Sequence, residues 1–299
     1  MPLKIQVQTS IPRANVFRFE NFWVQHDGFL QQVVNAWHSV QNDDNNALAI
    51  SAKFKQLRRN LKCWSKQLSK LSLLIDNYHK VIHFLDIVEE CRLLSVPELI
   101  FRNIVKKQVV TLLQYKHAYW KKRCRQNWAQ FGGENTKFFH AMATERFRKN
   151  TITQITSTNG VEVTDHEGKA AIVLEAYRSR LGVSESPSMF FNLSELFDKR
   201  DDLDDLVLPF SSQEIDSIIA HLPADKAPGP DGFNGCFFKK CWPIISQDFY
   251  RLFADFHAGI ANLNALNYSF ITLVPKKPSP QFAHDYRPIS LMNNSHDRK

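Results

Sequence analysis

Residues 226–233, KAPGPDGF, place two prolines and two glycines within eight positions. Proline fixes φ and glycine adopts backbone conformations closed to other residues, so this composition predicts a sharp structural turn rather than a helix interior. We assign the turn to Pro228, Gly229, Pro230, Asp231 and Gly232, and expect the Asp231 carboxylate to bond backbone amides within it. A second proline-marked stretch, YRPISL, follows at residues 286–291.

Upstream of this turn, residues 50–85 carry apolar side chains at alternating steps of four and three. This spacing predicts a helix of five heptads with one apolar seam. A second helical pattern covers about residues 98–131, after Pro97. An antiparallel helical hairpin within one chain would bury both seams, and a homodimeric coiled coil through the 50–85 seam is the alternative.

Basic residues are concentrated in the same part of the chain. The whole chain has a formal charge of +8, but residues 46–150 hold 21 Lys and Arg against 7 Asp and Glu. This favours a polyanionic partner, with a solvated helical face as the alternative. Residues 115–128, YKHAYWKKRCRQNW, interleave cations with aromatic rings that either stack on bases or close the helical seam. The candidate residues for RNA or DNA binding are Lys116, Tyr119, Lys121, Lys122, Arg123, Arg125, Lys137, Arg146, Arg148 and Lys149.

The following segments alternate short elements with connectors. Residues 151–164 predict a β-hairpin around Asn159-Gly160, and residues 165–182 predict a helix that ends at Gly182. Serine, proline and a run of aspartates at 183–210 indicate a connector. Ser211 followed by Glu214 predicts the N-terminus of a helix that ends near Pro223.

The composition excludes several classes of protein. With 43% hydrophobic residues the chain can bury a substantial core, and no apolar run approaches the ~20 residues of a membrane span. Since the first residues also lack a signal peptide, we expect a soluble, intracellular protein without membrane contact. Five scattered cysteines favour reduced thiols, and the Cys236 and Cys241 pair favours packing over a zinc site.

Four blocks of the sequence carry a specific resemblance, and together they span nearly the whole chain. FRFENFW at 17–23 and RQNWAQFGGENTKFFHAMATERFRKNTI at 125–152 resemble the region that links endonuclease to polymerase in LINE-type (non-LTR) retrotransposons. The two later blocks resemble the start of the reverse transcriptase domain of the same elements, closest to the plant versions. They are SSQEIDSIIAHLPADKAPGPDGFNGCFFKKCW at 211–242 and NYSFITLVPKKPSPQFAHDYRPISLMN at 267–293. One departure is Gly133, where the family commonly has an aspartate.

The resemblance, taken with the residue patterns, implies a mainly α fold with small β elements (α+β). It would consist of a long antiparallel helical hairpin plus a partial reverse-transcriptase fingers subdomain. We divide the chain into a remnant of an endonuclease C-terminal strand at 1–16, a basic helical interdomain region at 17–150, a β-hairpin and helix at 151–182, an acidic connector at 183–210, and the fingers part at 211–299.

The resemblance also implies a nucleotide-binding role for three cations. Lys276 and Lys277 follow the predicted strand FITLVP, and Arg287 lies on its returning partner, so these residues would hold the triphosphate of an incoming nucleotide in the fingers hairpin. An exposed edge hairpin, protected from aggregation by lysine and proline, explains the same composition.

The resemblance further implies that the catalytic centre is missing. In this family two Mg²⁺ ions are held by aspartates that follow YRPISL, and we expect no cofactor in this piece. The pairs Asp43-Asp44, Asp201-Asp202 and Asp204-Asp205 lie in polar stretches without apolar strands, so we exclude them as that site. We therefore expect a truncated, inactive member of the RNA-directed DNA polymerases. The alternatives are an RNA- or DNA-binding helical module without sequence preference and a coiled-coil interaction protein.

Overall fold

The computed structural model describes residues 16–41, 45–68, 70–124, 136–182 and 207–292, together with Asn192 and Glu195. Within these ranges the chain is mostly helical and carries two antiparallel two-stranded sheets, which confirms the mainly α fold with small β elements. The elements in chain order are η1 (Asn21–Gln25), α1 (Phe29–His38), α2 (Asn46–Leu68), α3 (Leu71–Cys91), α4 (Val96–Cys124), α5 (Thr136–Asn150), β1 (Ile155–Thr156), β2 (Glu162–Val163), α6 (His166–Leu181), α8 (Ser212–His221), α9 (Gly235–His257), η3 (Leu263–Ala265), β3 (Ser269–Pro275), η4 (Ala283–Asp285) and β4 (Tyr286–Met292).

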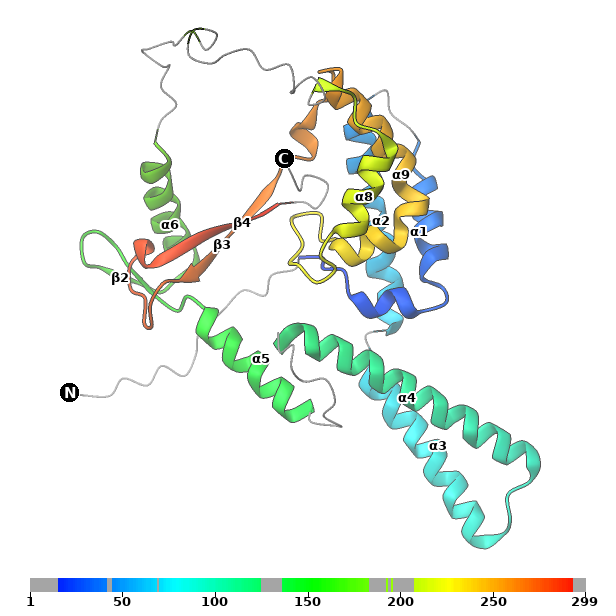
Figure 1. Cartoon of the computed structure of the whole chain (residues 1–299). Helices are drawn as coiled ribbons and strands as arrows, with labels where there is room; N and C mark the ends of the chain where they lie inside the picture. Colours follow the sequence, from blue (N-terminus) through cyan, green and yellow to red (C-terminus); the bar gives the residue numbers. More distant parts are fainter. Residues whose placement is uncertain are drawn as a thin grey trace, which may run out of the picture.

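Helices α1, α2, α8 and α9 pack together with η1, and we call this assembly the body (Figure 1). Its core is rich in aromatic rings. The ring of Phe54 lies 5.2 Å from the rings of both Trp37 and Phe233, and 6.2 Å from that of Phe249. The core residues come from positions 19–61 and from positions 222–266, which belong to two of the five predicted regions. The boundaries of those regions stay predictions.

The turn at 226–233 fastens the N-terminal segment to the body. Gly232 has a φ of 80°, and a Cβ built on it would lie 2.5 Å from the carbonyl oxygen of Phe17. The Phe19 amide donates to the Gly232 carbonyl at 2.8 Å, and the Asp231 Oδ1 accepts from the Phe233 amide at 3.0 Å. Only glycine fits both this conformation and this approach of two backbones. The proline and glycine residues of the turn therefore allow it to contact residues 17–19, which lie more than 200 positions earlier in the chain.

The predicted continuous helix over 50–85 is two helices in the structure. Helix α2 ends at Leu68 and α3 begins at Leu71, with Lys70 between them in a non-helical conformation (φ −93°, ψ 28°). The seam changes partner at this break. Ile50, Phe54 and their neighbours on α2 are buried in the body, whereas Ile75 and Leu85 on α3 are buried in the contact with α4.

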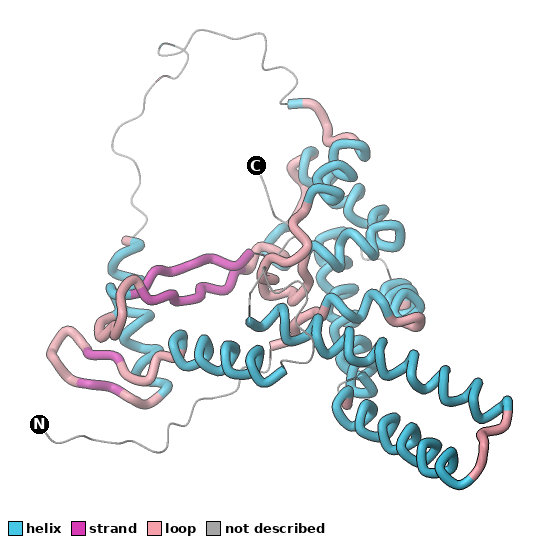
Figure 2. Tube along the Cα trace, turned by 60° about the horizontal axis from the view of Figure 1, so that its bottom comes forward, coloured by secondary structure: helices cyan, strands magenta, loops and turns pink. Residues whose placement is uncertain are grey.

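Helix α3 and residues 96–113 of α4 form an antiparallel hairpin that projects from the body, and we call it the arm (Figure 2). Arg102 links the two helices because it pairs with Asp86 and, at 2.6 Å, with Glu89. At the tip, Arg92 pairs with Glu98 at 2.7 Å. The second half of the predicted seam thus pairs with α4 within the chain, whereas its first half packs in the body and not against the second helix of the predicted hairpin.

The strands β1 and β2 and helix α6 lie near the strands β3 and β4 (Figure 1). β1 and β2 flank the predicted Asn159-Gly160 turn, where Gly160 has a φ of 78°. Helix α6 begins after Asp165, whose side chain accepts from the Gly168 amide at 2.6 Å. β3 pairs antiparallel with β4, and the Tyr177 hydroxyl of α6 donates to the Tyr286 carbonyl of β4 at 3.3 Å. Ser211 caps α8 as predicted, by accepting from the Glu214 amide at 3.2 Å.

Candidate nucleic-acid interface

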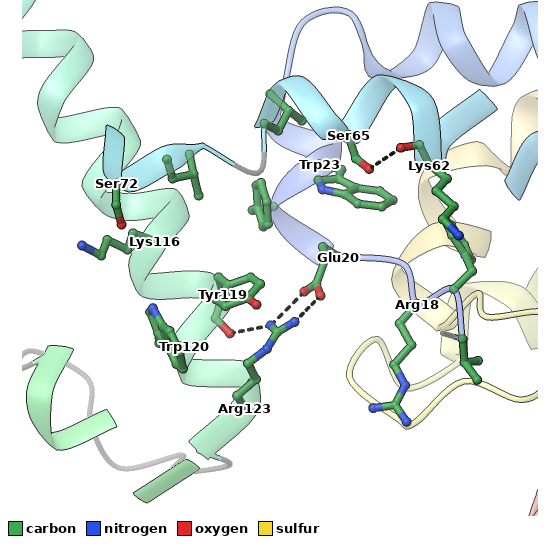
Figure 3. A pocket seen from close by; sticks show the side chains of 15 residues that line it. Arg18, Glu20, Trp23, Lys62, Ser65, Ser72, Lys116, Tyr119, Trp120 and Arg123 are labelled. Atoms are coloured by element: carbon green, nitrogen blue, oxygen red, sulfur yellow. Dashed lines mark hydrogen bonds and ion pairs between the residues drawn. The ribbon is translucent and has the colours of Figure 1, made fainter. Parts of the chain in front are cut away.

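A cavity of about 490 Å³ opens where the N-terminal segment, the break between α2 and α3, and the end of α4 meet (Figure 3). Four of the residues that line it are cationic and five are aromatic. They are Arg18, Lys62, Lys116, Arg123, Phe17, Phe22, Trp23, Tyr119 and Trp120. This cavity brings together three of the ten predicted nucleic-acid-binding residues, namely Lys116, Tyr119 and Arg123.

Arg123 is held in the wall of the cavity by three contacts. Its guanidinium reaches both oxygens of Glu20, at 2.7 and 3.4 Å, and donates to the Tyr119 carbonyl at 3.0 Å. The guanidinium carbon also lies 3.3 Å from the centroid of the Tyr119 ring, a cation–π contact that covers one face of that ring. The two contacts with Glu20, drawn as dashed lines in Figure 3, connect the end of α4 to the N-terminal segment.

Lys122 has a similar structural role. Its Nζ donates to the carbonyl of Phe19 at 2.7 Å, and burial lowers the pKa of this amine while nearby Glu20 opposes the shift. The sequence predicted phosphate contact for Lys122 and Arg123, but the structure gives both a partner in the N-terminal segment. Three further cations line the cavity: Lys116, which is half-buried, and Lys62 and Arg18, which are exposed.

Sequence reasoning missed Arg18 and Lys62. Arg18 stands in the FRFENFW block, and Lys62 follows the buried Leu61 of α2 by one position. Both lie far from residues 115–128 along the chain, so only tertiary contacts, among them the packing of η1 against α4, could place them there. The aromatic residues of the FRFENFW block were the available signal, because they seat this segment in the core.

Of the other predicted basic residues, Lys121 belongs to α4, and Lys137, Arg146, Arg148 and Lys149 belong to α5. Arg125 is outside the described residues, as are the side chains of Lys121 and Lys137. Arg146 is half-buried and Arg148 exposed, while Lys149 pairs with Glu145 at 2.7 Å. Helix α5 packs on α4 through Phe139, whose ring lies 5.5 Å from that of His117. The predicted basic residues of α5 therefore lie on the helix that packs against α4.

The three predicted nucleotide-binding residues gather at one end of the β3–β4 hairpin. Lys276 Nζ donates to the His284 carbonyl at 2.7 Å, and Lys277 pairs with Asp285 at 2.9 Å. This pairing, with the amides of Gln281 and Phe282, holds the pKa of Asp285 well below its usual range. Arg287 lies opposite Val274 in the register and is exposed.

The described residues contain no group of three or more His, Cys, Asp or Glu that could hold a metal ion. Cys241 is buried in the core, which raises the pKa of its thiol, and Cys236 is half-buried. Asp231, in the turn, is buried beside Arg58, and burial raises the pKa of its carboxyl to about 7. None of the described helices has the length and apolarity that a membrane span requires.

Comparison with known proteins gives one informative similarity. The chain is 21% identical, over 314 aligned positions, to the transposon TX1 uncharacterized 149 kDa protein of Xenopus laevis. The alignment covers 98% of this chain and 23% of that protein, so the chain spans less than a quarter of its relative. No protein-family model matches. The similarity supports a protein related to non-LTR retrotransposons.

Proposed function

We propose that this chain is a truncated, plant-like piece of a non-LTR retrotransposon polyprotein. It would combine the interdomain helical region with the fingers part of a reverse transcriptase. We further propose that it binds RNA or DNA without sequence preference. The observation that carries this function is the cavity at the end of α4, which joins Arg18, Lys62 and Lys116 with aromatic rings from two segments.

The chemistry of the cavity suits a nucleic-acid strand. Lysine and arginine neutralise phosphates without reading the base sequence, and aromatic rings stack on any base. Lys116 and Trp120 lie one helical turn apart on α4. A strand that binds Lys116 through a phosphate would therefore place a neighbouring base close to the Trp120 indole. Arg123 covers one face of the Tyr119 ring, and the Trp120 ring lies 5.2 Å from it in the same part of the cavity.

The β3–β4 hairpin supplies the second part of the proposal. Arg287 would contact a phosphate of an incoming nucleotide, and Lys276 and Lys277 would join it after exchanging their contacts with His284 and Asp285. The blocks that this chain matches precede those that carry the metal-holding aspartates of the family. We therefore propose that these 299 residues by themselves do not add nucleotides.

A salt titration tests the binding function. We expect the chain to bind labelled single-stranded RNA and DNA of unrelated sequences with similar affinity. The logarithm of the binding constant should fall by roughly 0.7 per neutralised phosphate for each tenfold rise in salt. A flat salt dependence, or no binding at low salt, would remove this function.

Primer extension tests the absence of catalysis. The purified chain, incubated with primer, template, nucleotides and Mg²⁺, should extend no more primer than a heat-inactivated sample. Extension above that control would show that residues of this chain hold the catalytic metals, and the proposal of an inactive piece would fail.

A further inference from the structure

The arm exposes large apolar side chains on both of its helices. Phe84 and Ile87 of α3 and Ile100, Phe101 and Ile104 of α4 are each between 46% and 62% exposed. At the tip, Leu93 is 90% and Val96 69% exposed. We call these seven residues the apolar face of the arm. Monomeric proteins rarely expose a contiguous apolar patch of this kind, which marks an interaction surface.

Helix geometry places Phe84, Ile100 and Ile104 on the same side. Phe84 and Ile104 each precede a buried residue, Leu85 and Val105 respectively, by one position. Because α3 and α4 run antiparallel, the same offset turns both side chains toward the same side of the pair. Asp86 follows Leu85 by one position, and its ion pair with Arg102 lies on the opposite side. Near Phe84 and Ile104 the two sides of the arm therefore differ, with apolar side chains on one and the Arg102 ion pair on the other.

The size of the apolar face matches what association of two copies requires. At roughly 100 Å² for each half-exposed large side chain, its seven residues present on the order of 700 Å². A stable protein–protein interface buries about 800 Å² on each partner. The seven residues are uncharged, and the exposed Lys80 and Lys107, one helical turn from Phe84 and Ile104, border them.

We propose that the apolar face of the arm binds the same face of a second copy of this chain. Two hairpins that meet face to face form an antiparallel four-helix bundle, and a two-fold axis makes one patch complementary to itself. This interface differs from the coiled coil considered for the 50–85 seam, because that seam is already buried within the chain. The dimer leaves the cavity at the far end of α4 open.

The test is the mass of the full chain in solution, measured by light scattering at ~1–100 µM in about 1 M salt. High salt strengthens apolar association and removes association through bound nucleic acid. We expect the mass to rise from 34.7 kDa toward twice that value with concentration. Phe84→Glu combined with Ile104→Glu should keep the mass at that of one chain and leave the circular dichroism unchanged, since both side chains are exposed.

Leu99→Glu combined with Val110→Glu is the matched control. These residues are 41% and 54% exposed, and their positions on α4 turn away from the apolar face. The control should form dimers as the unchanged chain does. Three results would each overturn the proposal. The unchanged chain could stay monomeric at every concentration, the Phe84 and Ile104 variant could still form a dimer, or the control variant could lose the dimer as well. Association that disappears in high salt would assign it to nucleic acid instead.

Discussion

The body and the arm are built from helices with the same apolar spacing, yet they differ in what covers their apolar side chains. In the body, Phe54 is 3% exposed and is surrounded by rings from α1, α9 and the 226–233 turn. In the arm, Phe84 is 62% exposed, because the contact between two helices buries only one stripe of each. Periodicity therefore indicates where a helix has an apolar side, but not whether that side has a partner within the chain.

The largest expected effect contrasts two phenylalanines. Phe54→Ala should lower the free energy of unfolding by about 3–5 kcal/mol, because it leaves a cavity among packed rings. Phe84→Ala should change it by less than about 0.5 kcal/mol when measured by urea unfolding at a dilution where the chain is monomeric. Equal losses from the two variants would mean that the arm buries Phe84 as the body buries Phe54.

The burial of the Asp231 carboxyl predicts that the stability of the folded chain depends on pH. The pKa of Asp231 in the folded chain, about 7, lies above its ordinary value of 3.8, so folding favours the protonated form. This contribution to stability is complete below pH 4 and is lost as the pH rises through 7. Asp231→Asn keeps the acceptor for the Phe233 amide and removes the charge, so it should stabilise the protein at pH 8 by on the order of 3 kcal/mol.

That gain should shrink toward zero between pH 7 and pH 4, measured as the difference in unfolding free energy between the variant and the unchanged chain. A difference that is constant with pH would show that Asp231 titrates as an exposed carboxyl does, and the turn would then not be buried under the N-terminal segment.

Gly232 and Gly160 have nearly the same φ, so alanine substitutions at the two positions separate the cost of the backbone conformation from the cost of steric overlap. Gly232→Ala should cost about 2 kcal/mol or more, since its Cβ meets the Phe17 carbonyl in addition to the unfavourable φ. Gly160→Ala should cost about 1 kcal/mol, because nothing lies within 4 Å of its Cβ. Thermal unfolding of both variants measures the difference, and equal losses would indicate that residues 17–19 do not dock on the turn.

The sequence predicted those features of the structure that depend on residues close together in the chain. The Asn159-Gly160 turn, the Ser211 cap and the helix end at Gly182 each depend on residues within four positions of one another, and all are present. The 226–233 turn could be predicted for the same reason.

Contacts between distant segments could not be predicted in this way. Nothing within residues 50–85 marks the helix break after Leu68, which follows from a change of partner between the body and α4. Likewise, the sequence around Lys122 and Arg123 does not reveal that Phe19 and Glu20, more than 100 residues away, accept their hydrogen bonds.

The most direct test of nucleic-acid binding by the cavity compares the removal of two charges from the cavity with the removal of two from the arm. Lys62→Gln with Lys116→Gln neutralises two lysines that line the cavity, and Lys80→Gln with Lys107→Gln neutralises two exposed lysines of the arm. The salt dependence of RNA binding is measured by fluorescence anisotropy. The cavity variant should lower the slope by roughly 1.4, about two phosphates, and the arm variant should leave it unchanged. Equal losses of slope, or none from the cavity variant, would contradict binding at this cavity.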